Sequence, residues 1–287
     1  MAQFDVHTAV TNAIIQTLEA GEAGQWTCPW HRKGGSSLPV NALTGKHYRG
    51  INTLSLWCAE QAYGYGDSRW ATYRQWQELG AQVRKGERSS LIVFWKDLGR
   101  DEGEDDKPRF VARASYGFNA SQVEGAPEAG EPLPPSEWTI PEVFAGFVTR
   151  TGARVTHGGD AAFYMPSEDR IVLPPRDRFP TAHGYASTAL HELTHWTGHK
   201  SRLDRDLTGR FRSQAYAAEE LVAELGAAFL AAELGLEAEP HPTHASYIGS
   251  WLKLLRSDPK AIFTAASAAS RAAGYLASLQ SEMAQAA

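Results

Sequence analysis

Cysteine is scarce in this sequence: Cys28 and Cys58 are the two cysteines among 287 residues. They are too few for a disulfide framework and too far apart for a CxxC redox or zinc pair, so we expect reduced thiols. The sequence also lacks an apolar run of about 18 residues, which a transmembrane helix requires. Its first residues lack the basic segment and apolar core of a signal peptide. These absences predict a cytoplasmic protein that is neither secreted nor membrane-spanning.

The chain as a whole is slightly acidic, with 28 Lys and Arg, 33 Asp and Glu, and a net charge of −5. This overall charge argues mildly against binding of nucleic acid. Residues 32–100, however, contain eleven Lys or Arg and five Asp or Glu, and six of the nine tryptophans precede residue 100. Aromatic rings stack on unpaired bases while cations neutralise phosphates, so this mixture indicates binding of single-stranded DNA. The alternative is that these tryptophans form a core, since Trp is usually buried.

Four residues of this region are candidate DNA contacts on chemical grounds. Trp76 lies in the string YRQW, Arg49 in HYR, and Arg84 and Lys85 are adjacent cations. We expect Trp76 to stack on a base and the three cations to meet phosphates. No motif defines these positions.

The pattern along the chain predicts an α+β fold in two domains. The first domain, residues 1–124, is expected to bind DNA and to combine helices with one hairpin. Its expected helices cover residues 6–18, 51–59 and 72–79, and its expected hairpin strands cover residues 89–98 and 109–118, joined by an acidic loop.

A linker is expected at residues 125–140, because residues 125–135 (GAPEAGEPLPP) concentrate Pro, Gly and Glu with little to bury. The second domain, residues 141–287, is expected to be mostly helical with a small antiparallel sheet. Its expected helices cover residues 141–149, 184–196, 216–230 and 261–287, and its expected strands cover residues 162–165 and 170–173.

The string HELTH places His191 and His195 four residues apart in a predicted helix. Positions i and i+4 share a helix face, so both imidazoles are aimed at one point where a divalent metal can bind. Glu192 then lies beside the metal and can act as general base toward a water whose pKa the cation has lowered. HExxH also occurs by chance, but the Ala- and Leu-rich surroundings predict buried helices in which these charged groups need partners.

A third metal ligand has several candidates. His199 follows the helix-breaking Gly198, and position 201, where a third histidine would be expected in one class of zinc site, is a serine. The predicted helix over residues 216–230 offers Glu219, Glu220 and Glu224, of which the last two share a face. By resemblance to glutamate-type zinc peptidases, Glu220 is assigned as the ligand and Glu224 as the acceptor for a ligating histidine, although the two roles could be exchanged.

Five strings together are far more specific than HExxH, and they resemble the ArdC antirestriction family over almost the whole chain. They are TGKHYRGIN (44–52), TYRQWQELGAQVRKG (72–86), IVFWK (92–96), HELTHWTG (191–198) and EELVAELGAAFL (219–230). The resemblance implies an N-terminal single-stranded DNA-binding domain, also found fused to plasmid primases, and a C-terminal zincin-like metallopeptidase domain. It further implies protection of incoming plasmid DNA from host restriction during conjugation.

Three functional hypotheses remain open from the sequence. The protein binds one divalent metal, zinc or manganese, and as an enzyme it would be a metallopeptidase of the HExxH/glutamate type acting on a restriction enzyme or another protein. Alternatively, it is a DNA-dependent metalloprotease that cleaves DNA-bound proteins. In the third hypothesis the zincin fold is a catalytically silent scaffold, and protection comes from DNA binding alone.

Overall fold

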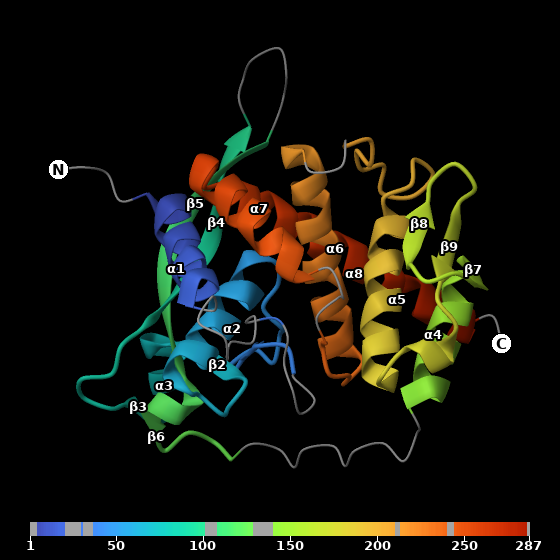
Figure 1. Cartoon of the computed structure of the whole chain (residues 1–287). Coiled ribbons are helices and arrows are strands. Elements are labelled where there is room, and N and C mark those ends of the chain that lie inside the picture. The colour runs from blue at the N-terminus through green and yellow to red at the C-terminus, as the bar shows by residue number, and fades with distance from the viewer. Residues whose placement is uncertain are drawn as a thin grey trace.

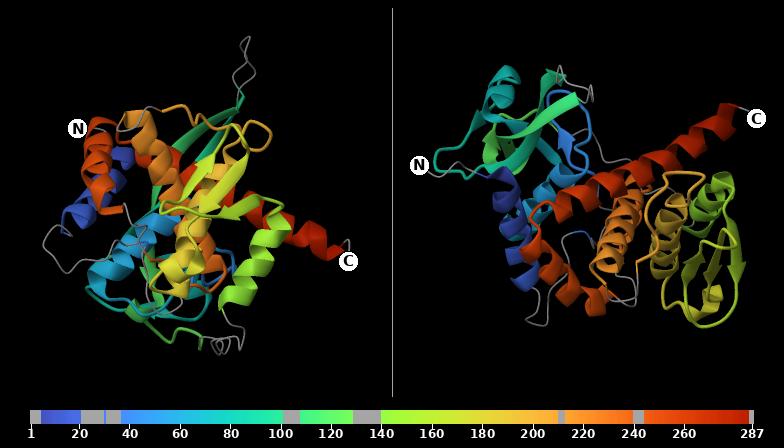
Figure 2. Two further views of the ribbon diagram at one scale, coloured as in Figure 1. Left: turned by 45° about the vertical axis from the view of Figure 1, so that its right-hand side comes forward. Right: turned by 90° about the horizontal axis from the view of Figure 1, so that it is seen from above.

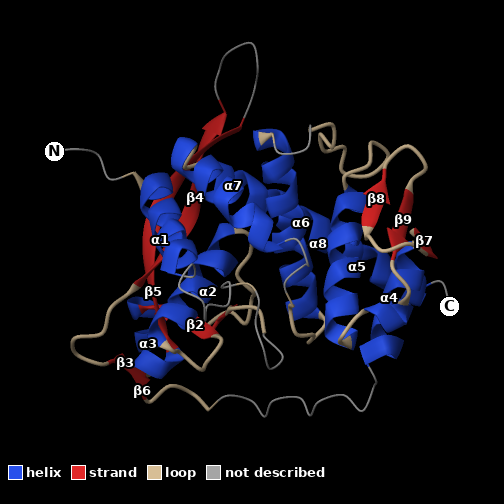
Figure 3. Ribbon diagram, in the orientation of Figure 1, coloured by secondary structure: helices blue, strands red, loops and turns tan. Residues whose placement is uncertain are grey.

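The structure, a computed structural model, describes residues 5–20, 30, 37–100, 108–128, 140–209, 213–239 and 244–285. It has the predicted α+β fold (Figures 1 and 3). The helices are α1 (Val6–Ala20), α2 (Ile51–Tyr63), α3 (Tyr73–Glu78), α4 (Ile140–Thr151), α5 (Ala182–Thr197), α6 (Gln214–Glu233), α7 (His244–Ser257) and α8 (Ala261–Gln285). The strands are β1 (Val40–Asn41), β2 (Arg69–Thr72), β3 (Gln82–Val83), β4 (Ser90–Arg100), β5 (Pro108–Asn119), β6 (Val123–Glu124), β7 (Arg154–His157), β8 (Phe163–Met165) and β9 (Arg170–Leu173).

The N-terminal sheet has the strand order β1-β2-β5-β4. Strands β4 and β5 form the predicted antiparallel hairpin, although its connecting residues 101–107 lie outside the described part of the chain. Helix α2 covers the free edge of β4, where the Asn52 side chain donates a hydrogen bond to the Val93 carbonyl (2.8 Å) and accepts one from the Val93 amide (2.7 Å). The backbone N–H and C=O groups of Val93, which no further strand of the described residues pairs at this edge of the sheet, are thereby hydrogen-bonded.

The second sheet is small and has the order β7-β9-β8. Strands β8 and β9 are antiparallel, as the sequence predicts. Strand β7, which pairs in parallel with β9, was not predicted because four residues show too little alternation. This sheet lies beside α5, which contacts both β8 and β9 (Figure 1).

One hydrophobic core joins residues from both predicted domains. Helix α8 extends across the molecule and contacts α2, α6, α5 and α4 (Figure 2). Its buried face is built largely of alanines, which allow neighbouring helices to approach closely. Polar contacts also join the halves: the Thr11 hydroxyl donates to the Pro259 carbonyl (2.6 Å), the Gly50 amide donates to the Ser270 hydroxyl (2.8 Å), and Arg256 forms an ion pair with Glu19.

Most N-terminal tryptophans belong to the core. Trp30, Trp57, Trp70 and Trp76 are at most 1% exposed, whereas Trp95 is 48% exposed. Trp26 lies outside the described residues, as do residues 129–139 of the predicted linker. The core interpretation of these tryptophans is therefore correct for the four buried ones. In the described part of the chain, no helix is both long and apolar enough to cross a bilayer.

Helices α5 and α6 approach each other closely at Gly226. A Cβ atom at Gly226 would lie 2.5 Å from Thr194 Cγ2 and 2.7 Å from Thr194 Oγ1. Thr194 is fully buried and donates a hydrogen bond to the Leu190 carbonyl (2.8 Å), so it has no free space into which to move. The missing side chain at position 226 is therefore what lets the two helices pack at this distance.

We expect Gly226→Ala to lower the free energy of unfolding by about 1–3 kcal/mol, because the added methyl overpacks the α5–α6 contact. The matched control is Gly274→Ala in α8, where an added Cβ meets no atom within 4 Å. Alanine in an open helical position should be neutral or stabilise by up to about 1 kcal/mol. Urea unfolding of both variants tests this; equal stabilities would contradict it.

Candidate metal centre

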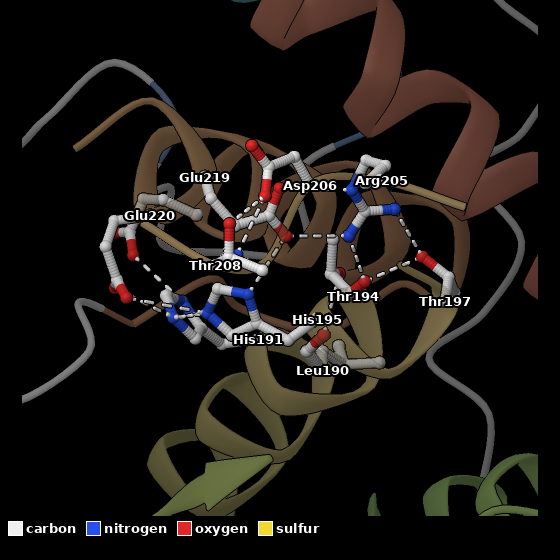
Figure 4. Close-up of polar contacts among 11 residues, drawn as sticks. Leu190, His191, Thr194, His195, Thr197, Arg205, Asp206, Thr208, Glu219 and Glu220 are labelled. Carbon is white, nitrogen blue, oxygen red and sulfur yellow. Dashed lines mark hydrogen bonds and ion pairs between the residues drawn. The ribbon is translucent and has the colours of Figure 1, made fainter. Parts of the chain in front are cut away.

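Helix α5 carries both predicted histidines. The helix begins after Thr181, whose hydroxyl accepts a hydrogen bond from the Gly184 amide (2.9 Å). His191 and His195 project from one face of the helix, with ring centroids 4.9 Å apart and Nε2 atoms 3.2 Å apart (Figure 4). The spacing in HELTH thus gives two nitrogens aimed at the same point.

Helix α6 brings a carboxylate to the same point. Glu220 Oε2 lies 3.4 Å from His191 Nε2, and Glu220 Oε1 lies 3.7 Å from His195 Nε2. With metal–ligand distances of about 2.1 Å, neighbouring donors in a tetrahedron are about 3.4 Å apart. Each of the three residues offers one donor atom, and these atoms lie within 4.8 Å of one another. Two imidazoles and one carboxylate therefore fit a single divalent cation.

A second carboxylate lies at the other nitrogen of each imidazole. Glu224 Oε2 is 3.4 Å from His191 Nδ1, and Glu219 Oε1 is 3.1 Å from His195 Nδ1. A carboxylate at Nδ1 favours the tautomer in which Nδ1 carries the proton and Nε2 keeps the lone pair needed for metal binding. Glu224 is therefore placed to orient a ligand, and Glu220 to be one.

Arg205 fixes the position of Glu219. Its guanidinium donates to both carboxylate oxygens of Glu219, at 2.8 and 3.1 Å. It also donates to the Thr194 carbonyl (2.6 Å) and to the Thr197 hydroxyl (2.8 Å), which ties it to the end of α5 (Figure 4). Only 10% of the Arg205 side chain is exposed, so this bidentate pair is shielded from solvent.

The pKa values follow from this buried arrangement of opposite charges. Burial alone would lower the pKa of His191, but its interactions with Glu220 and Glu224 outweigh that effect and raise the pKa to about 10. For Glu220 burial has the opposite effect and would raise the pKa, but contacts with His191 and His195 hold the pKa below its ordinary value. The pKa of Glu219 is lowered for the same reason, by His195 and Arg205 against the effect of burial.

Glu192 lies in the same cavity as the three donor residues. It is 3% exposed, and the backbone amide of Tyr164 in β8 donates a hydrogen bond to it. Burial raises its pKa, an effect that His191 and His195 partly offset. The cavity of about 280 Å³ is also lined by aromatic residues: Phe163, Tyr164, Tyr216 and Tyr247. Tyr216 bonds to both Glu220 and the Tyr247 hydroxyl (2.9 Å).

Sequence reasoning missed part of this centre. Glu219 was considered only as an alternative carboxylate, and Arg205 and the two tyrosines were not considered. Arg205 lies between the helices, outside any helical repeat, so its distance from Glu219 could not be derived from spacing. His199, the weaker alternative ligand, is half-buried and instead contacts the Ser201 hydroxyl through Nδ1 (2.8 Å).

The predicted DNA contacts have mixed placements. Trp76 is fully buried and donates its indole N–H to the Phe118 carbonyl (3.0 Å), so the prediction that it stacks on a base is wrong. Stacking requires a free ring face, and the core uses both faces of this ring. Arg49, Arg84 and Lys85 are exposed, and Arg84 pairs with Glu87 at 2.8 Å.

Comparison with known proteins covers both halves of the chain. The family described as N-terminal domain of anti-restriction factor ArdC matches residues 4–127, and the family described as zincin-like metallopeptidase matches residues 142–268. An uncharacterised Sinorhizobium fredii protein, y4eC, is 46% identical over 97% of this chain and 93% of its own length. A DNA primase TraC of Escherichia coli is 39% identical over 97% of this chain, which corresponds to 20% of the primase.

Two crystal structures are similar over nearly the whole chain. Both are of the antirestriction protein ArdC from plasmid R388. Its metal-free structure has a TM-score of 0.81 and 38% identity, covering 97% of this chain and 99% of that one. Its Mn(II)-bound structure has a TM-score of 0.79 and 39% identity, covering 96% of this chain and 98% of that one.

We expect Glu219→Gln to weaken zinc or manganese binding by about 10- to 100-fold, because His195 loses the carboxylate that orients it. The matched control is Glu233→Gln at the other end of α6, which should bind metal like the wild type. Titration calorimetry with each cation measures the affinity. Equal affinities of the wild type and the Glu219 variant would show that the contact does not orient His195.

Proposed function

The chain belongs to the ArdC antirestriction family, and from this premise we propose that it protects incoming plasmid DNA from host restriction during conjugation. The observation that carries the proposal is the structural match to ArdC of plasmid R388 over almost the whole of both chains. A match of this extent includes both the N-terminal region and the metal centre. The protein would act in the cytoplasm, where restriction enzymes meet incoming DNA.

The two halves of the chain have different proposed roles. Residues 1–124 would bind single-stranded DNA, residues 141–287 would hold the metal, and residues 125–140 would link these two parts. Two separate family matches support this division. The shared core indicates that the halves form one folding unit despite their separate roles, because α1 and α2 pack on α7 and α8. The exposed cations Arg49, Arg84 and Lys85 are proposed to meet phosphates.

The proposed ligands are His191, His195 and Glu220, with Glu224 and Glu219 orienting the histidines. Zinc suits two imidazoles and a carboxylate, and manganese is supported by the Mn(II)-bound structure of the plasmid R388 protein. A divalent cation supplies Lewis-acid activation of a water molecule and of a scissile carbonyl. Glu192 would accept a proton at its carboxylate, since it faces the same cavity as the ligands.

Peptide hydrolysis is the activity that this geometry supports best. A purely structural metal would be satisfied by the ligands alone, whereas this centre adds a buried carboxylate with a raised pKa and an accessible aromatic cavity. A restriction enzyme or another DNA-bound protein is the proposed substrate. The rival is a silent zincin scaffold that protects by coating DNA.

We expect Glu192→Gln to abolish protection in a conjugation assay that compares restricting and non-restricting recipients, because the general base is lost. The variant should still bind metal and single-stranded DNA. The control is Glu168→Gln, an exposed carboxylate on the β8–β9 turn, which should protect like the wild type.

His195→Ala distinguishes the metal from the base. This variant should lose both metal and protection, because one of three ligands is removed. Full protection by the Glu192 variant would support the silent scaffold instead. Cleavage of a DNA-bound protein by the wild type only in the presence of DNA would identify the DNA-dependent protease.

A further inference from the structure

The β4–β5 hairpin exposes an unusual amount of aromatic surface. Phe94, Trp95, Phe110 and Tyr116 are 61%, 48%, 55% and 51% exposed. The ends of both strands extend beyond the neighbouring helices (Figure 1). Large aromatic side chains exposed on a projecting element are candidate binding residues.

The strand register sorts these side chains onto two faces. Phe94 pairs directly with Arg113, and Lys96 is two residues further along β4 on the same face. Trp95 pairs with Ala112, so it shares the opposite face with Phe110 and Tyr116. Helix α1 lies on that opposite face, where the His7 ring is 6.1 Å from the Trp95 ring. We call the face that carries Phe94, Lys96 and Arg113 the outer face of the hairpin.

The outer face carries the two exposed cations Lys96 and Arg113. Three further exposed cations, Arg84, Lys85 and Arg88, immediately precede β4, and the one carboxylate among residues 84–96, Glu87, pairs with Arg84. In a chain whose net charge is −5, this is a local excess of positive charge. A polyanion is therefore the partner that fits the surface electrostatically.

The geometry favours a single strand over a duplex. Arg88 precedes β4, and from there to Lys96 the strand spans roughly 26 Å at about 3.3 Å per residue, enough for several nucleotides. The Phe94 ring can stack on an unpaired base, whereas the bases of a duplex are already stacked.

We propose that the outer face of the hairpin binds single-stranded DNA, with a base stacked on Phe94 and phosphates against Arg113, Lys96 and Arg88. This inference rests on the DNA binding included in the proposed function. In this proposal Phe94, and not the buried Trp76, is the residue that stacks on a base. Arg84 and Lys85 lie just before β4 in the sequence, next to Arg88, and would contact the same DNA.

The test compares Phe94→Ala with Phe110→Ala, two exposed phenylalanines on opposite faces of one hairpin. Fluorescence anisotropy with a labelled oligothymidine of about 20 nucleotides measures the affinity. Phe94→Ala should bind about 5- to 150-fold more weakly, the range for one lost base stack, while Phe110→Ala should stay within about twofold of the wild type. Thermal unfolding monitored by circular dichroism verifies that both variants are folded.

The charge contribution is measured separately with a Lys96→Gln/Arg113→Gln double variant. The slope of log affinity against log salt concentration should become shallower by about 1.4, since each phosphate contact on a single strand contributes about 0.7. The control is Arg154→Gln/Lys200→Gln, which removes two exposed cations in β7 and just after α5, on the other side of the molecule from the hairpin (Figure 1), and it should keep the wild-type slope.

Different failures have different meanings. Wild-type affinity in the Phe94 variant, or an equal loss in the Phe110 variant, would overturn the outer face while leaving DNA binding intact elsewhere. Absence of oligothymidine binding by the wild type would instead remove DNA binding from the proposed function. Normal DNA binding with lost protection in the Phe94 variant would assign the surface to a protein partner and overturn the inference.

Discussion

The close packing of α5 against α6 is the constraint on which the metal centre depends. Three donor atoms from two helices must converge within a few ångströms, and this requires a short interhelical distance next to them. Gly226 against Thr194 provides that distance. The histidines on α5 and the glutamates on α6 would have the right sequence spacing at any helix separation, but only close contact turns them into one site.

Buried charge is the second constraint. Two imidazoles and four carboxylates, Glu192, Glu219, Glu220 and Glu224, lie in or next to the α5–α6 contact, where each isolated charge would be costly. These charges offset one another, because each imidazole lies against carboxylates and Arg205 forms an ion pair with Glu219. A divalent cation would complete this balance. The same arrangement that makes the cluster tolerable in the interior also orients the nitrogen atoms toward the metal position.

The N-terminal half shows why composition and surface must be distinguished. Its tryptophans and cations are mixed in sequence, yet the fold sends most tryptophans to the core and leaves phenylalanines and a tyrosine exposed on the hairpin. Trp76 lies in the string YRQWQE and Phe94 in the string LIVFWK, and each has a cation two residues away. What separates them is that α3 packs Trp76 beneath β5, while Phe94 lies on the face of the hairpin opposite α1 and is 61% exposed.

The sequence by itself predicted the long helices, the β4–β5 hairpin and the candidate donor residues, because these depend on local spacing: the HExxH motif in one helix and glutamates four residues apart in another. Only the tertiary structure decided which residues are buried and which distant residues meet. The pairing of Glu219 with Arg205 crosses a loop, strand β7 is too short to be recognised from its pattern, and the largest hydrophobic cluster joins segments more than 200 residues apart. Such contacts depend on how whole helices pack against one another, and this packing cannot be predicted from a local pattern of residues.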